Sequence, residues 1–217
     1  MPSIRDVPPR TTLSVQNLLL RGVPNEYIEG TLDSYVQDDE VKDFFNKYLT
    51  HLHDMYDDRV NLCLYGSNGS GKTFLSSLVV KEAYRLRYNS AITTMANLID
   101  LTFKYDKTPE DFEKIKTYRS ANFLVIDEVG KENFTKTGSN INLLEEILRS
   151  AVVEGQVVIL CTNLPLEGER GLYKQYGASI KSLINGSFVK LEFDNDDYRP
   201  THQKKKRALR ILAGEEI

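Results

Sequence analysis

The sequence predicts an α/β fold in which a parallel sheet of five strands lies between layers of helices. Three observations lead to this prediction. Short apolar runs suited to buried strands recur along the chain, segments with helical periodicity separate them, and a glycine-rich loop joins the first run to the helix that follows it. The five predicted strands are residues 61–65, 91–95, 122–126, 156–161 and 188–193.

The elements between these runs have signatures of their own. Residues 13–56 read as mostly helical, and 73–88 continues from the glycine loop as an amphipathic helix. Helices are expected at 97–105, at 109–119 with Pro109 suited to the first turn, and at 141–153. The runs 122–126 and 156–161 are typical of strands buried on both faces, whereas 188–193 alternates apolar residues with Lys190 and Glu192.

Composition places the chain among ordinary globular proteins. It has 217 residues, which suits one main domain, with 41% hydrophobic and 27% charged residues and a formal net charge of −3. No apolar stretch approaches membrane-spanning length, and residues 1–10 lack the apolar run of a signal peptide. Cys63 and Cys161 lie inside apolar runs, as expected for buried thiols in a reducing compartment. We therefore expect a cytoplasmic protein with no membrane partner.

A phosphate-binding loop is the clearest motif in the sequence. Its glycines allow the tight backbone that aims N–H groups at phosphates, Lys72 is placed to reach the β- and γ-phosphates, and Thr73 offers a hydroxyl to Mg²⁺. The pattern predicts a P-loop site for ATP and Mg²⁺. We assign nucleotide binding to Gly66, Ser67, Asn68, Gly69, Ser70, Gly71, Lys72, Thr73 and Phe74.

Polar residues at the ends of two later strands complete the predicted chemistry. Asp127 and Glu128 follow a buried run, so Asp127 is a candidate Mg²⁺ ligand and Glu128 a candidate base that polarises the attacking water. Asn163 follows the next strand, where we expect its side chain to orient that water. A carboxylate pair of this kind favours hydrolysis over simple nucleotide storage.

The segments around these motifs resemble the AAA+ helicase loaders of the DnaC type and their relatives, the IstB-type transposition helper ATPases. The resemblance covers residues 22–199. Besides the phosphate loop, it is carried by VPNEY at 23–27, TLDSY at 31–35, LVIDEVG at 124–130, CTNLP at 161–165 and DYR at 197–199.

The resemblance implies a domain division and further site residues. Residues 1–21 become a short N-terminal extension, 22–199 an AAA+ ATPase domain and 200–217 a basic C-terminal tail, without a sizeable separate N-terminal domain. In such proteins the segment before the first strand borders the adenine, which assigns Tyr27 and Ile28 to the base pocket. A late arginine contacts the γ-phosphate, which assigns Arg199. Self-assembly into an oligomer or filament is also implied.

The chain departs from these relatives in two places. They carry an arginine that completes a neighbour's site in the segment matching 177–183, whereas this chain has only Lys181 there, so Arg170 and Arg149 remain alternatives. They also have a helicase-gripping N-terminal domain. Its role falls either to residues 13–20, whose Leu18-Leu19-Leu20 run equally suits packing against the core, or to the basic tail.

The function implied is that of an ATP-dependent helicase loader in DNA replication, with a replicative DNA helicase and single-stranded DNA as partners. Lys204–Arg207 of the tail suit phosphate backbones or simple solvation, and the aromatic candidates for base stacking, Phe103, Tyr105 and Phe134, are scattered in sequence. Two rivals remain: an IstB-type transposition helper acting on duplex DNA, and a nucleotide-dependent interaction module with little turnover.

Overall fold

Five parallel strands form a single sheet in the order β2-β3-β4-β1-β5. They are β1 (Asn61–Gly66), β2 (Ser90–Thr94), β3 (Phe123–Val129), β4 (Val157–Thr162) and β5 (Phe188–Phe193). The structure, a computed structural model, describes residues 13–132 and 139–194. Every strand lies within about three residues of its predicted place. The predicted fold class is therefore confirmed.

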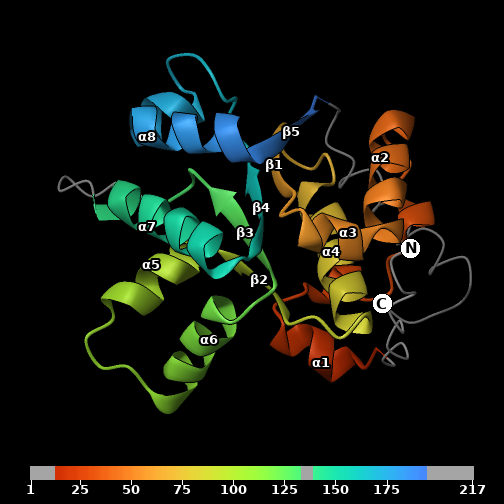
Figure 1. Cartoon of the computed structure of the whole chain (residues 1–217), viewed down its shortest axis with the longest axis horizontal. Coiled ribbons are helices and arrows are strands. Elements are labelled where there is room, and N and C mark those ends of the chain that lie inside the picture. Colours follow the sequence, from red (N-terminus) through yellow and green to blue (C-terminus); the bar gives the residue numbers. More distant parts are fainter. Residues whose placement is uncertain (1–12, 133–138, 195–217) are drawn as a thin grey trace, which may run out of the picture.

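Helices cover both faces of the sheet (Figure 1). On one face lie α1 (Val15–Leu20), α2 (Asp39–Thr50), α3 (Leu52–Asp57) and α4 (Lys72–Arg85). On the other lie α5 (Met95–Phe103), α7 (Ser139–Glu154) and α8 (Leu172–Ser187), while α6 (Pro109–Arg119) follows α5 beside β2. Among the described residues, no helix is both long enough and apolar enough to span a bilayer.

Successive side chains of each strand point to opposite faces of the sheet, so the hydrophobic core has one part on each face. Val157, Ile159 and Cys161 of β4 pack toward α2, α3 and α4, whereas Val158 and Leu160 pack toward α5, α7 and α8. Because both faces are covered, the strands read as continuous apolar runs. Cys63 and Cys161 are free and buried, and burial raises the pKa of the Cys63 thiol to about 12, so it is an inert core group.

Local signals explain where several helices begin. The Asp38 carboxylate accepts hydrogen bonds from the backbone N–H groups of Glu40 and Val41 at the start of α2. At the start of α6, Thr108 and Asp111 form a capping box around Pro109. Both helices therefore start at sequence positions that supply their own N-terminal hydrogen-bond partners.

The helix prediction was wrong in one segment and incomplete in another. Residues 22–38 contain only two short 3-10 turns, Asn25–Tyr27 and Leu32–Ser34, because Gly22 with φ of 80°, Pro24 and Gly30 interrupt the helical pattern. Helix α8 was not predicted. It contains Gly177, whose φ of 85° and ψ of 179° kink the helix. A glycine inside a segment lowers its helix propensity, which weakens the helical signal in the sequence.

The N-terminal segment covers the outer edge of β2. The backbone N–H of Ile92 donates to the carbonyl oxygen of Arg21 at 2.8 Å, and a side chain at Gly22 would collide with the Ile92 carbonyl oxygen. In the Leu18–Leu20 run, Leu18 is fully buried, whereas Leu19 and Leu20 are exposed. The run thus packs against the core through one of its three leucines.

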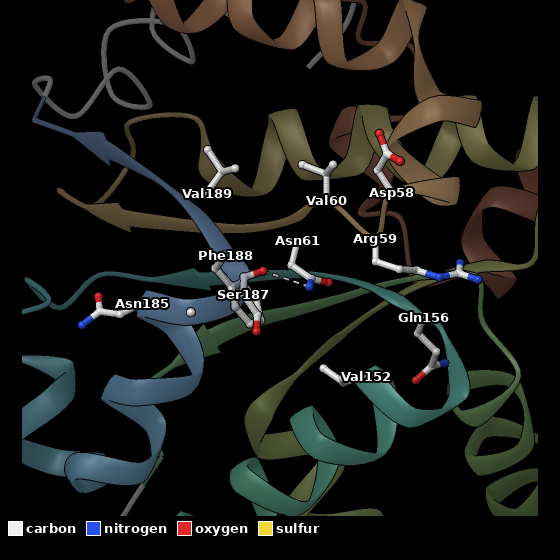
Figure 2. Close-up of a pocket in the computed structure, with 11 residues that line it drawn as sticks. Asp58, Arg59, Val60, Asn61, Val152, Gln156, Asn185, Ser187, Phe188 and Val189 are labelled. Atoms are coloured by element: carbon white, nitrogen blue, oxygen red, sulfur yellow. Dashed lines mark hydrogen bonds between the residues drawn. The ribbon is translucent and has the colours of Figure 1, made fainter.

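A cavity of about 490 Å³ opens at the edge of the sheet where the strands begin (Figure 2). Its wall includes Asn61 at the start of β1, whose side-chain amide donates to the Ser187 carbonyl oxygen at 3.0 Å and whose oxygen accepts from Val158 N–H at 2.7 Å. The cavity therefore lies at the opposite end of β1 from the glycine loop and contains none of the predicted site residues.

Candidate nucleotide-binding site

The glycine loop between β1 and α4 is held against two neighbouring elements. Gly66 has φ of 121°, and a side chain there would collide with the Phe193 carbonyl oxygen of β5. That oxygen accepts a hydrogen bond from Ser67 N–H at 2.7 Å. Gly71, with φ of 94°, caps α4, and a Cβ would lie 2.7 Å from the Tyr35 ring. The loop therefore requires glycine at both of these positions.

Lys72 is buried within this loop. Its ammonium donates to the carbonyl oxygens of Gly66 at 2.9 Å and Ser67 at 2.6 Å, and to Ser70 Oγ at 3.1 Å. Only 5% of the residue is exposed. The ammonium thus lies in the concave side of the loop, beside the positive end of α4, where an anion is favoured.

Thr73 and Asp127 bring β3 to the start of α4. Thr73 Oγ1 donates to Asp127 Oδ2 at 2.7 Å, and Glu128 N–H donates to Asp127 Oδ1 at 2.7 Å. Burial raises the pKa of the Asp127 carboxyl, and these two hydrogen bonds partly oppose that shift. One hydroxyl and one carboxylate beside a phosphate loop fit Mg²⁺, which is usually held by one or two carboxylates together with substrate phosphates.

Glu128 has an unusual backbone conformation. Its φ is 59°, in the left-handed region that non-glycine residues rarely adopt, and the pairing of β3 with β4 shifts register between Ile126 and Val129. Its half-exposed side chain forms an ion pair with Lys131 at 2.6 Å. The bulge turns the Glu128 side chain out of the alternation of the strand and toward solvent at the end of the sheet.

Asn163 follows β4 next to this bulge. The preceding residue, Thr162, donates from Oγ1 to the Val129 carbonyl oxygen at 2.7 Å and accepts from Leu164 N–H at 3.1 Å. This link fixes the end of β4 to the end of β3, so Asn163 and Glu128 extend from neighbouring strand ends. Sequence reasoning did not assign Thr162 this role, which depends on the pairing of the two strands.

The segment assigned to the base lies against the first turns of α4. The rings of Tyr27 and Phe74 meet edge to face with centroids 5.6 Å apart, whereas the Ile28 side chain is buried in the core. Lys81 of α4 donates to carbonyl oxygens in this segment, and Gln37 Nε2 donates to the Gly69 carbonyl oxygen at 3.2 Å. Lys81, Tyr35 and Gln37 were not identified from sequence.

The candidates for a residue acting on a neighbouring copy have different surroundings. Lys181 pairs with Glu167 at 2.9 Å, and Arg149 pairs with Glu145 at 2.8 Å and donates to Ser179 at 3.1 Å. Within residues 13–132 and 139–194, the Arg170 side chain has no ion pair or hydrogen bond. Arg199, Phe134 and the basic tail lie outside the described residues.

Comparisons with known proteins place the chain in a family. The family model of IstB-like ATP-binding proteins matches residues 36–206. No curated protein sequence gives a significant match.

Among solved structures, the DnaC helicase loader is 19% identical with a TM-score of 0.65, and the match covers 79% of this chain and 100% of that one. DnaI is 17% identical with a TM-score of 0.62, covering 82% of this chain and 98% of that one. AMPPCP-bound DnaA from Aquifex aeolicus is 18% identical with a TM-score of 0.60, covering 90% of this chain and 57% of that one. These likenesses show a shared AAA+ fold. Because the family model matches most of the sequence, the chain belongs to the family of IstB-like ATP-binding proteins.

Proposed function

We propose that this protein is an ATP-dependent helicase loader that binds ATP, Mg²⁺ and single-stranded DNA and places a replicative helicase on DNA. The family description supports ATP binding. The proposal of loading is supported by the likeness to the DnaC loader and to DnaI, each matched over nearly its whole solved length. A reducing cytoplasm is the compartment that suits two buried free thiols.

The observation that supports ATP hydrolysis is the hydrogen-bonded contact of Thr73 with Asp127, beside Glu128. Lys72 and the loop N–H groups would bind the phosphates, and Thr73 and Asp127 would hold Mg²⁺, which supplies charge neutralisation on the phosphate oxygens. Glu128 would accept the proton of the attacking water, and Asn163 would orient that water. Arg199 would contact the γ-phosphate.

Exposed aromatic residues at and beside the connection from α5 to α6 support binding of single-stranded DNA. Phe103 is 58% exposed, Tyr105 97% and Phe112 58%. Phe103 ends α5, Tyr105 lies in the connection that follows, and Phe112 lies in the first turn of α6. Phe103 and Tyr105 were candidates from the sequence, whereas Phe112 was not. Bases of any sequence can stack on exposed rings of this kind.

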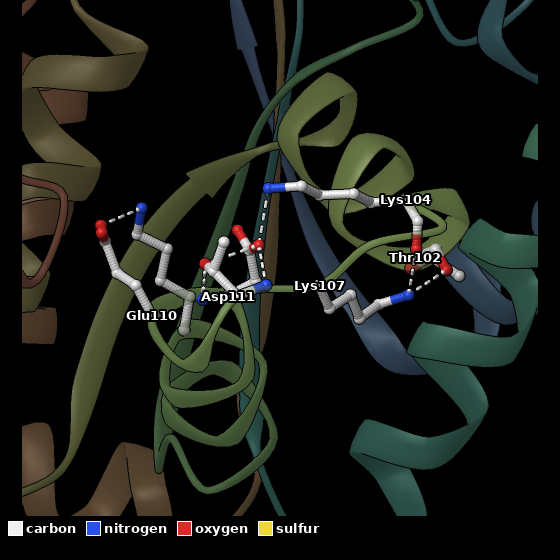
Figure 3. A network of polar contacts seen from close by, with 7 residues as sticks. Thr102, Lys104, Lys107, Glu110 and Asp111 are labelled. Carbon is white, nitrogen blue, oxygen red and sulfur yellow. Dashed lines mark hydrogen bonds and ion pairs between the residues drawn. The ribbon is translucent and has the colours of Figure 1, made fainter.

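The connection between α5 and α6 is held in place by polar contacts (Figure 3). Lys104 pairs with Asp111 at 2.6 Å, and Lys107 donates to the carbonyl oxygens of Thr102 at 3.0 Å and Lys104 at 2.8 Å. The rings are therefore presented on a defined backbone with two lysines beside them. Residues 100–113 hold five carboxylates against these two lysines, so the rings and not net charge support this part of the proposal. An ordered aromatic surface lowers the entropy lost when a flexible strand is bound.

A second candidate function is that of a transposition helper ATPase. It is favoured by the family model, whose description is that of IstB-like proteins. This candidate uses the same nucleotide chemistry, so the two differ in their macromolecular partner. A third, an interaction module with little turnover, is favoured by the lack of arginine in residues 177–183.

The partner is tested by pull-down with Glu128→Gln protein in ATP and Mg²⁺, which should hold the nucleotide-bound state. The matched control is Lys72→Ala, which should not bind nucleotide. Recovery of a hexameric replicative helicase by Glu128→Gln and not by Lys72→Ala supports the loader. Recovery of a transposase supports the second candidate. Recovery of neither, together with hydrolysis that DNA does not stimulate in wild type, supports the interaction module.

A further inference from the structure

Lys81 is a buried lysine with no part in the phosphate chemistry described above. It lies in the third turn of α4 and only 9% of it is exposed. Its ammonium donates to the carbonyl oxygens of Tyr27 at 3.2 Å, Ile28 at 2.7 Å and Gly30 at 2.5 Å. An ammonium has three donors, so its hydrogen-bonding capacity is filled by one short piece of backbone.

Burial of a charged lysine is costly unless the charge is paired or fully hydrogen-bonded. The nearby charged groups that act on it are Glu29, which favours its charge, and Arg85, which opposes it. The acceptors that solvate the charge are backbone oxygens of residues 27–30, which we call the base segment. The segment therefore folds around the ammonium, and its conformation depends on that hydrogen bonding.

The base segment is also fitted to the first turn of α4. The Tyr27 ring lies edge to face with Phe74, and a side chain at Gly30 would collide with the Phe74 ring. Phe74 directly follows Lys72 and Thr73, the proposed ligands of the phosphates and Mg²⁺. One helix therefore supplies the phosphate ligands at its start and, two turns later, the cation that holds the base segment.

We propose that Lys81 is a positioning residue for nucleotide binding, which fixes the base segment against α4 so that it is preformed for the base. This inference rests on the proposed function. Without the ammonium, three carbonyl oxygens lose their donor, and the segment samples other conformations. Affinity for a nucleotide then falls in proportion to the fraction of molecules that still hold the binding conformation.

The test compares the binding of ATP with the binding of inorganic tripolyphosphate, which has no base. Both affinities are measured by calorimetry in the presence of Mg²⁺. The variant is Lys81→Met, which keeps the length of the side chain and removes its donors. The control is Lys114→Met on α6, where the lysine makes a solvent-exposed pair with Glu110. We expect Lys81→Met to bind ATP about tenfold more weakly, as it would if the segment were ordered in one molecule of ten, and to bind tripolyphosphate as wild type does.

Steady-state hydrolysis gives a second readout. We expect KM for ATP to rise in Lys81→Met while kcat stays within about twofold, because binding is lost equally in the ground state and in the transition state. Equal weakening of both ligands, or unchanged binding of ATP, would overturn the proposal.

Two further measurements address a variant that does not fold and a wild type that does not recognise the base. If Lys81→Met does not fold, Gly30→Ala displaces the same segment from Phe74 without removing the ammonium, and the proposal requires the same selective loss of ATP. If wild type binds ATP no better than tripolyphosphate, the base segment does not bind the base and the inference about Lys81 falls. The phosphate-loop assignment would still stand if Lys72→Ala abolished tripolyphosphate binding.

Discussion

The hydroxyl of Thr73 donates to the carboxylate of Asp127 across 2.7 Å, joining the first turn of α4 to the end of β3. These residues are 54 positions apart in sequence, and the parallel pairing of the strands brings them together. The contact gathers the two proposed Mg²⁺ ligands before any ion is bound. It also places a carboxylate where water solvates it poorly.

Burial of Asp127 leads to a prediction about stability and pH. The pKa of Asp127 is raised, so the folded chain holds this proton more tightly than the unfolded chain does. As the pH rises from the ordinary pKa of an aspartate through the raised value, Asp127 loses its proton in the fold. The free energy of unfolding therefore falls over that pH range. At neutral pH and without nucleotide, Asp127→Asn should therefore resist urea better than wild type. This advantage should shrink as the pH is lowered, while Mg²⁺-dependent nucleotide binding should be lost.

Asp111→Asn provides a control of opposite sign. Hydrogen bonds from Lys104 and Thr108 lower the pKa of Asp111, so its charge stabilises the fold and its removal should lower the urea midpoint at neutral pH. A lower midpoint for Asp127→Asn than for wild type would contradict our account of the buried carboxylate.

Two glycines with positive φ, Gly66 in the phosphate loop and Gly168 in the loop between β4 and α8, allow backbone strain to be distinguished from steric collision. Gly168→Ala, at φ of 93° with no atom within 4 Å of a new Cβ, should lower the free energy of unfolding by roughly 1–2 kcal/mol and leave nucleotide binding intact. Gly66→Ala should destabilise the protein more and abolish binding, because its Cβ displaces Phe193 from the loop. Urea unfolding and titration with a fluorescent ATP analogue measure both effects. Equal losses in both variants would show that the contact with Phe193 is unimportant.

The exposed rings at the end of α5, in the connection and at the start of α6 should contribute to DNA binding. Substituting Phe103, Tyr105 or Phe112 by alanine should weaken binding of an oligo-dT strand by about 1–3 kcal/mol each, measured by fluorescence anisotropy. Thermal stability should change little because these side chains are largely exposed. Val153→Ala removes an apolar side chain that is 86% exposed on α7 and should have no effect on binding. Three variants that bind as wild type would exclude this surface.

Arg170 is the candidate for action on a neighbouring copy. Glu128→Gln and Arg170→Ala should each hydrolyse ATP slowly, but a mixture should recover activity, since a copy with intact Glu128 can then meet Arg170 of another. A trans-acting arginine commonly contributes on the order of 10³-fold or more to hydrolysis. Parallel mixtures with Lys181→Ala or Arg149→Ala serve as controls, because both side chains are already paired within the chain. A mixture no more active than its components would exclude Arg170.

Much of the fold followed from the sequence because local patterns agree with the tertiary structure. Continuous apolar runs such as 122–126 and 157–161 occur because those strands are covered on both faces. The glycine loop was placed correctly between β1 and α4 because strand, loop and helix are adjacent in sequence. The kinked α8 escaped prediction because Gly177 interrupts a helix that tertiary packing maintains through Tyr176 and Ile180.

The contacts that shape the site were harder to predict because they join distant segments. Tyr35 packs against Gly71, Thr162 bonds to Val129, and Lys81 binds the carbonyl oxygens of residues 27–30. None of these pairs leaves a periodic signal in the sequence. A lysine among the apolar residues of α4 gives no indication that backbone oxygens will surround it. The roles assigned to Asn163 and Arg199 stay predictions.

Both margins of the sheet are unsuited to joining another strand. On the β2 side, the carbonyl of Arg21 already occupies the outward N–H of Ile92. On the β5 side, the exposed Lys190 and Glu192 present charges along the outer strand, which discourages pairing with a further chain. Across residues 13–132 and 139–194, these two edges therefore disfavour the merging of copies into extended β-aggregates, and an ordered assembly through helices and loops is favoured.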